Sequence, residues 1–165
     1  MNSNVLPLPP RAPRANTPAW LRSLAEWLLR RSGWKMAGQW PDLDKVVVVG
    51  APHSSAWDGI YGLIAKVAMD LHIVFMGKQE VFFWPLGPLL KWLGGIPVNR
   101  ASPGGIANQV AQQLQESERM WFVLAPEGTR KAVAQWKTGF WKIAKQAKVP
   151  VVCVYFDYPS KTIGV

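Results

Sequence analysis

The stretch KVVVVGAPHSSAWDGIYGLIAKVAMD, at residues 45–70, decides the fold class. Its four consecutive valines, Val46–Val49, form a β-branched apolar run, which is typical of a strand buried on both faces of an α/β sheet. Gly50-Ala51-Pro52-His53 ends this strand. Ser54 or Ser55 then caps a helix with inward-facing apolar residues. A strand, a short loop and a helix in this order indicate one α/β unit.

Alternating apolar strands and helices continue along the chain. We expect strands at residues 73–76, 120–125 and 151–156, and helices that begin near Ser102 and Thr138. Residues 161–165 indicate a returning strand in a hairpin with 151–156, and because the chain stops there we expect a truncated C-terminus. The predicted fold is a single α/β domain with a mixed, mostly parallel open sheet flanked by helices.

The first 33 residues are expected to precede this domain, which spans 34–165. Residues 1–16 are rich in proline and predict a disordered tail. Residues 17–33 predict an amphipathic helix, with Thr17 as its N-cap and Gly33 at its end. One side of this helix is apolar: Trp20, Leu21, Leu24, Trp27 and Leu28. That side either faces the core or lies in a membrane interface, and its tryptophans favour the interface.

Composition limits the classes of protein that this chain can be. Its 165 residues are 49% hydrophobic and contain one cysteine, which excludes a wholly disordered chain and a disulfide scaffold. The net charge of +9 indicates an anionic partner: nucleic acid, a phosphorylated substrate or acidic lipid. Ten tryptophans beside that charge favour a membrane interface. No apolar stretch is long enough to cross a bilayer and no signal peptide is indicated, so we expect a cytoplasmic protein that contacts a membrane.

The segment from Lys78 to Arg100 is unusually apolar and broken by prolines and glycines. It is too apolar for a solvated loop and too interrupted for one long helix. Two possibilities remain, burial in the core or an exposed apolar patch beside a binding site.

Two polar clusters follow predicted strands directly. One is 53–58 and the other is Glu127-Gly128-Thr129-Arg130. Ligands bind outside the carboxyl ends of strands in open α/β sheets, so we expect both clusters to line one crevice. Asp58, in the first turn of its helix, either reaches back to orient His53 as a general base or complements the helix N-terminus.

The sequence offers no strong nucleophile beside this base. Cys153 falls in a strand that we expect to be buried, where a thiol is inert packing. Ser54 and Ser55 are explained as helix caps. A base without a nucleophile indicates activation of a substrate hydroxyl or of water. No close set of His, Cys and carboxylate residues indicates a metal site, and none is expected.

Two arginines close glycine-containing turns at the rim of the expected crevice. Arg100 ends Gly94–Arg100 and Arg130 ends the second polar cluster. Each is either a solvated surface charge or part of a phosphate grip, because forked guanidinium donors match phosphate oxygens.

Together, four blocks resemble the glycerolipid acyltransferase superfamily, typified by 1-acyl-glycerol-3-phosphate (lysophosphatidate) acyltransferases. In chain order they are His53-Ser54-Ser55-Ala56-Trp57-Asp58 (H-x4-D), Lys78 through Gly94-Gly95-Ile96-Pro97-Val98-Asn99-Arg100, Pro126-Glu127-Gly128-Thr129-Arg130, and Val149-Pro150-Val151-Val152. The resemblance covers residues 34–157. Ala125 and Cys153 depart from the pattern at positions that bear on acyl or acceptor preference.

The resemblance implies a glycerol-phosphate acyltransferase-like fold and an O-acyltransferase of phospholipid biosynthesis. Such an enzyme moves a fatty acyl group from acyl-CoA or acyl carrier protein, without a cofactor, to a lysophospholipid hydroxyl, with lysophosphatidate as the expected acceptor. His53 would be the general base and Asp58 would orient it. By the same matching, Lys78, Arg100 and Arg130 would bind the acceptor phosphate, and Glu127, Gly128 and Thr129 would shape the site.

The implied location is the cytoplasmic face of a membrane, as a peripheral or monotopic protein on an anionic lipid surface, without nucleic acid as a partner. Two alternatives stay open. The acceptor is a different lysolipid, or the chain is a non-catalytic basic, Trp-rich module that binds membrane or nucleic acid. Interleaved basic and aromatic residues occur in single-strand binders, but no nucleic-acid motif is present.

Overall fold

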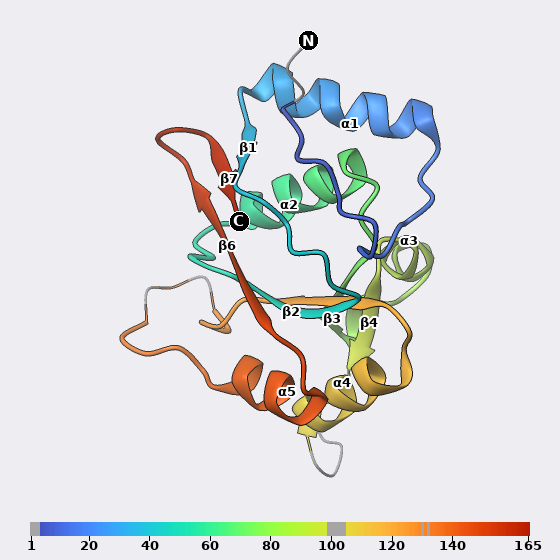
Figure 1. The fold of residues 1–165 in the computed structure, drawn as a ribbon, viewed down its shortest axis with the longest axis vertical. Coiled ribbons are helices and arrows are strands. Elements are labelled where there is room, and N and C mark those ends of the chain that lie inside the picture. The colour runs from blue at the N-terminus through green and yellow to red at the C-terminus, as the bar shows by residue number, and fades with distance from the viewer. Residues whose placement is uncertain (1–3, 99–104, 130, 132) are drawn as a thin grey trace.

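Seven strands form one sheet in the computed structural model, which describes residues 4–98, 105–129, 131 and 133–165, without the side chains of 78, 81 and 98 (Figure 1). The strands are β1 (Lys35–Ala37), β2 (Lys45–Gly50), β3 (Ile73–Lys78), β4 (Gly95–Val98), β5 (Met120–Leu124), β6 (Val151–Asp157) and β7 (Thr162–Gly164). Their order across the sheet is β1-β7-β6-β2-β5-β3-β4. Only the β6–β7 hairpin is antiparallel within this described sheet. The predicted mostly parallel α/β sheet is confirmed.

Helices cover both faces of the sheet. They are α1 (Ala19–Ser32), α2 (Ala56–Ala68), α3 (Leu86–Trp92), α4 (Gly105–Glu116) and α5 (Gly139–Ala147), with a 3-10 turn at Gln79–Val81. In Figure 1, α1 and α2 lie on one side of the sheet, and α4 and α5 lie on the other. The valines of β2 alternate between two apolar clusters: Val46 and Val48 face the α1–α2 side, and Val47 and Val49 face the α4–α5 side. Burial on both faces explains the unbroken valine run.

The prediction of a disordered tail over residues 1–16 is wrong for the described residues 4–16. Ala12 is fully buried, and Arg14 forms an antiparallel bridge with Leu71. The backbone N–H of Ala15 donates to the carbonyl of Asp70. This proline-rich segment is ordered because several of its backbone groups are paired with residues far along the chain, which local composition does not report.

The apolar side of α1 is exposed. Trp20 is 68% accessible, and Leu24, Trp27 and Leu28 are also exposed, whereas Ala25 and Leu29 hold α1 against the core. The structure therefore excludes the core-facing alternative for most of this side. Thr17 is not the N-cap, because Pro18 occupies that position and the backbone N–H of Thr17 donates to Asp70.

The segment before and through α3 forms an exposed apolar patch rather than a buried one. Trp84 is 83% accessible, and Phe83, Leu89 and Trp92 are exposed as well. No described helix combines the length and apolarity needed to cross a bilayer.

Cys153 is exposed, which corrects the expected burial. Side chains alternate along β6, and the face that carries Val151 and Cys153 is open, whereas Val154 on the other face is buried.

Candidate functional site

The two polar clusters meet because β2 and β5 are parallel neighbours in the sheet. His53 follows the carboxyl end of β2, and Glu127 follows that of β5. The backbone N–H of His53 donates to Oε1 of Glu127 at 3.1 Å, so the second loop holds the first. The two clusters therefore meet at one edge of the sheet, as predicted. Of the described residues in these clusters, His53 and Asp58 of the first line the cavity described below, whereas Glu127, Gly128 and Thr129 of the second do not.

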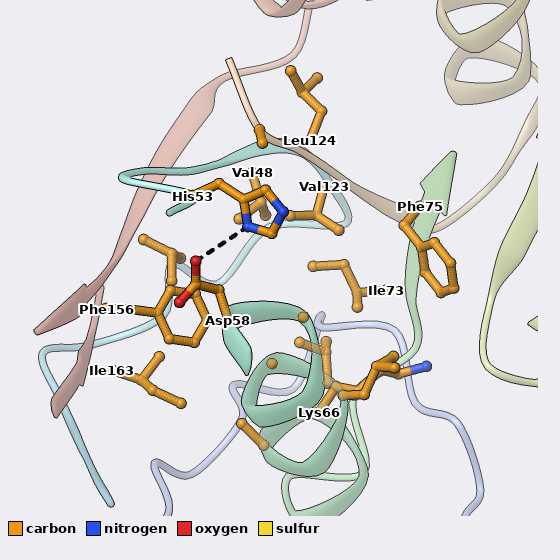
Figure 2. A pocket seen from close by; sticks show the side chains of 18 of the residues that line it. Val48, His53, Asp58, Lys66, Ile73, Phe75, Val123, Leu124, Phe156 and Ile163 are labelled. Atoms are coloured by element: carbon orange, nitrogen blue, oxygen red, sulfur yellow. Dashed lines mark ion pairs between the residues drawn. The ribbon is translucent and has the colours of Figure 1, made fainter. Parts of the chain in front are cut away.

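His53 and Asp58 form the centre of this site (Figure 2). Nδ1 of His53 lies 3.4 Å from Oδ2 of Asp58, within ion-pair distance and longer than an ordinary hydrogen bond. The Asp58 side chain is 1% accessible, whereas that of His53 is 32% accessible. The other imidazole nitrogen points away from Asp58 in Figure 2, where it is available to a bound molecule. Long contacts of this kind commonly tighten when substrate binds.

Asp58 also completes the N-terminus of α2. Ser55 is the N-cap, and its hydroxyl accepts a hydrogen bond from the backbone of Trp57 at 3.2 Å. Oδ2 of Asp58 accepts the backbone N–H groups of Ser54 and Ser55 at 2.8 Å each. The two arrangements that the sequence leaves as alternatives for Asp58 are therefore present together: it is the N3 partner of a capping box, in the first turn of α2, and the neighbour of an imidazole.

Tyr158 is a residue of this site that sequence analysis missed. Its hydroxyl donates to Oδ1 of Asp58, the oxygen that the loop amides do not use. Tyr158 lies between β6 and β7, 100 residues further along the chain, and no motif or spacing relates it to Asp58.

Glu127 is a buried carboxylate with one oxygen free. Its Oε2 has no hydrogen-bond partner among the described residues. A buried acceptor without a partner is costly to the stability of the fold. Gly128 has a positive φ of 63°, which suits glycine, and Thr129 is exposed with its hydroxyl accepting from the backbone of Lys131.

The predicted phosphate-binding cations fall largely beyond what the structure describes. Arg100 and Arg130 lie outside the described residues, and for Lys78 only the backbone, at the end of β3, lies within them. A cation that the sequence analysis did not single out is described here. A Cβ on Gly128 would meet Nζ of Lys137 at 2.8 Å, so this ammonium lies against the Glu127–Thr129 loop.

An apolar cavity of about 340 Å³ opens beside the His53–Asp58 pair. It runs between α2 and the sheet. Its wall is formed mainly by aliphatic and aromatic side chains, among them Val48, Leu63, Ile73, Phe75, Val123, Phe156 and Ile163. A cavity of this size and lining suits an apolar ligand whose polar end stays at the imidazole.

Lys66 is the charged exception in this wall. Its methylene stem lines the cavity, and Nζ is turned away and donates to the carbonyl of Leu93 at 2.6 Å (Figure 2). Burial lowers the pKa of Lys66 to about 8.

The described residues contain no group of three His, Cys, Asp or Glu side chains close enough to hold a metal ion.

Comparison with known proteins places this geometry in a family. The family model described as Acyltransferase matches residues 20–157. A 1-acyl-sn-glycerol-3-phosphate acyltransferase from Streptococcus pneumoniae (strain ATCC BAA-255 / R6) is 27% identical over 125 residues, which are 75% of this chain and 46% of that protein.

Among solved structures, the 1-acyl-sn-glycerophosphate (LPA) acyltransferase PlsC from Thermotoga maritima matches with a TM-score of 0.58 and 20% identity. That match covers 82% of this chain and 55% of the other, and it shows a shared fold. The chain spans about half the length of the relatives that it matches. Because the family model covers most of the chain, including the His53–Asp58 pair, the chain belongs to the Acyltransferase family.

Proposed function

We propose that this chain carries the active site of an O-acyltransferase that moves a fatty acyl group from a thioester to the hydroxyl of a lysophospholipid, with lysophosphatidate as the preferred acceptor. The observation that carries the proposal is the His53–Asp58 pair at the mouth of the apolar cavity. A general base beside an apolar cavity suits a reaction that joins an alcohol to a long acyl chain. The similar Streptococcus protein, named for this acyl transfer, supports the acceptor.

In the proposed reaction, Nε2 of His53 removes the proton of the acceptor hydroxyl as its oxygen attacks the thioester carbonyl. Asp58, 3.4 Å from Nδ1, orients the ring and stabilises the imidazolium that forms. Collapse of the tetrahedral intermediate breaks the C–S bond, and His53 returns the proton to the leaving thiolate. The products are an ester and a free thiol. General-base catalysis supplies about 10² to 10⁴ in rate.

The acceptor phosphate is proposed to bind at the Glu127–Thr129 loop. Lys137 brings an ammonium against this loop, and the resemblance adds Lys78, Arg100 and Arg130. Glu127 fixes the backbone of His53 through Oε1. Cations around a carboxylate-anchored loop suit a phosphate monoester, because charge-assisted hydrogen bonds to phosphate oxygens are strong.

The proposed location is the cytoplasmic face of a membrane, with the protein bound peripherally or as a monotopic protein. The exposed tryptophans and leucines of α1 and of the segment through α3 support contact with lipid. A basic chain of net charge +9 suits an anionic surface. The donor is a thioester of coenzyme A or of acyl carrier protein.

Release of free thiol from an acyl thioester, measured with lysophosphatidate and anionic vesicles, tests the proposal. Wild-type protein should release thiol only when the acceptor is present, and His53→Ala should lower kcat by about 10²-fold or more. His72→Ala is the matched control, because the second histidine of the chain does not line the cavity. Turnover by His53→Ala at the wild-type rate contradicts the role of His53 as base.

A panel of lysolipids offered with one acyl donor tests the acceptor. Preference for lysophosphatidate over lysolipids without a phosphate monoester supports the proposal. Activity with another lysolipid and none with glycerol phosphates would keep the acyl transfer and replace the acceptor. Inertness with all acceptors, together with tight salt-sensitive binding to single-stranded nucleic acid, would favour a binding module instead.

A further inference from the structure

We propose that Tyr158 is a positioning residue for the His53–Asp58 pair, holding one carboxylate oxygen of Asp58 so that the other faces the imidazole. This inference rests on the proposed function, because it assigns Tyr158 a part in the same reaction. Tyr158 does not touch the acyl donor or acceptor in this assignment. It acts through Asp58.

The two oxygens of Asp58 are held from opposite sides. Oδ2 accepts the amides of Ser54 and Ser55 and lies 3.4 Å from Nδ1 of His53. Oδ1 accepts the hydroxyl of Tyr158. With one oxygen held by the loop and the other by Tyr158, the carboxylate cannot rotate about its Cβ–Cγ bond without losing hydrogen bonds. The oxygen nearest to His53 is therefore fixed in place.

Tyr158 is itself held by the end of α1. Its ring packs edge-on against the buried Trp34, with centroids 5.3 Å apart and an interplanar angle of 84°. Three residues later, Nζ of Lys161 donates to the carbonyl of Ser32 at 2.9 Å, and the carbonyl of Lys161 accepts the backbone N–H of Lys35. The β6–β7 turn is thus anchored on both sides of Trp34, which sets the direction of the Tyr158 hydroxyl.

The alternative is a surface tyrosine that happens to touch a carboxylate. Tyr158 is 40% accessible, but its hydroxyl donates to Asp58, whose side chain is 1% accessible. Burial of the hydroxyl, and then its hydrogen bond to Asp58, raise the pKa of Tyr158. The phenol therefore stays protonated, and remains a donor, throughout the neutral range. Without it, Oδ1 would be a buried charged oxygen without a protein donor among the described residues, which is costly.

Tyr158→Phe tests the proposal by removing the hydroxyl and keeping the ring on Trp34. We expect kcat to fall about tenfold, the rate equivalent of one hydrogen bond to a charged group, with the KM for both substrates within about twofold of wild type. The matched control is Tyr155→Phe on the same hairpin, whose hydroxyl has no hydrogen bond to the described residues and whose ring packs on Gly164. It should retain wild-type kcat.

A double-mutant cycle separates positioning from a merely structural role. In the Asp58→Asn background, Tyr158→Phe should add almost no further loss of kcat, because the group through which it acts is already changed. A further tenfold loss in that background overturns the proposal, as does an unchanged kcat in Tyr158→Phe alone. Melting temperatures of the two tyrosine variants should agree within a few degrees.

Side-chain ¹⁵N NMR of the substrate-free protein provides a readout that needs no activity. With His72→Gln to assign the signals, His53 should be the Nδ1–H tautomer in wild type and in Tyr155→Phe, and a mixture of tautomers in Tyr158→Phe. An unchanged tautomer ratio in Tyr158→Phe overturns the proposal. If every variant and wild type are inactive with all acceptors, the proposed function fails while this measurement still decides the role of Tyr158.

Discussion

At the scale of single residues, Asp58 serves the helix and the site with the same oxygen. Oδ2 accepts the amides of Ser54 and Ser55, which satisfies the N-terminus of α2, and it also lies beside His53. The capping box is therefore what delivers a charged oxygen to the imidazole. The carboxylate placed in this way is held at Oδ2 by backbone amides and at Oδ1 by the hydroxyl of Tyr158.

Substitutions at Ser55 and Asp58 should separate these two functions. Ser55→Ala removes the hydroxyl cap but keeps the backbone amide, so it should cost about 1 kcal/mol of unfolding free energy with little change in kcat. Asp58→Asn keeps an oxygen acceptor but removes the charge, so kcat should fall about 10²- to 10⁴-fold. Urea unfolding and thiol release measure the two quantities. Equal loss of kcat in both variants would contradict the separation.

Lys66 is a buried ammonium that makes stability depend on pH. The folded chain releases the proton of Lys66 near its lowered pKa of about 8, whereas the unfolded chain keeps it to the ordinary value of 10.5. Between these values the unfolded chain binds more protons, so the free energy of unfolding rises with pH. Below pH 8 both states are charged, and the folded state carries the cost of the buried charge.

Lys66→Met should remove this dependence. From pH 7.5 to pH 10.5, the free energy of unfolding of wild type should rise relative to the variant by roughly 3 kcal/mol, the equivalent of the lowered pKa. Urea unfolding at the two pH values measures the difference. Lys142→Met, at an exposed position of α5, is the control, and its free energy of unfolding should change with pH as that of wild type does. If the free energies of unfolding of wild type and Lys66→Met change equally with pH, the Lys66 ammonium has the same pKa in the folded and the unfolded chain, which contradicts the prediction.

At the scale of elements, the sequence predicts the strands and helices that need only local signals and an apolar surface to pack against. The valines of β2 and the cap of α2 are local signals, and both elements form as predicted. The order of residues 4–16 depends instead on distant partners such as Asp70 and Leu71. The exposure of Cys153 is not predicted for a similar reason, because the apolar sequence of β6 does not reveal which of its two faces is covered.

The same distinction divides the candidate site. The chain order of motifs placed His53, Asp58 and Glu127 together, since parallel strands bring their carboxyl ends to one edge. The contact of Tyr158 with Asp58 and the shape of the cavity depend on how the β6–β7 hairpin and α2 pack, and no spacing in the sequence indicates this packing.

The exposed apolar side of α1 predicts that this helix contributes to binding of the protein to vesicles. Replacing Trp20, Leu24 and Trp27 together by Ser should lower partitioning onto anionic phospholipid vesicles by about tenfold or more, because apolar surface is no longer transferred from water. The melting temperature should change little, since these side chains are exposed. Sedimentation with vesicles measures the effect. Trp141→Ser, at an exposed position of α5 on the other side of the sheet, is the control.

Loss of vesicle binding in Trp141→Ser to the same extent would point to general apolarity rather than to α1. Unchanged sedimentation of the triple variant would assign membrane contact to another surface, of which the exposed segment through α3 is the next candidate.

At the scale of the whole molecule, the cavity lies between two layers of the fold, the helix layer and the sheet. One wall is α2 and the other is the sheet, to which β1, β2, β3, β5, β6 and β7 each contribute at least one lining residue. The polar edge of the same sheet carries the His53–Asp58 pair. One sheet thus positions an imidazole at its carboxyl edge and an apolar cavity beside it, which is the arrangement that the proposed acyl transfer needs.

Gly62 on α2 tests whether this space receives the acyl chain. It lines the cavity, and a Cβ there would lie 3.5 Å from Cζ of Phe156. Gly62→Leu should occupy cavity volume and lower kcat/KM for long acyl thioesters by about tenfold relative to short ones, since burial of roughly two methylenes is worth that factor. Thiol release with a series of acyl lengths measures the ratio.

Gly62→Ala is the control for this prediction. Its methyl group makes an ordinary van der Waals contact, and the helix gains about 0.5 to 1 kcal/mol from the loss of glycine, so chain-length preference should stay as in wild type. An equal loss for short and long thioesters in Gly62→Leu, with an unchanged melting temperature, would place the acyl chain outside the cavity. A shift of preference towards short chains would place the acyl chain in the cavity between α2 and the sheet.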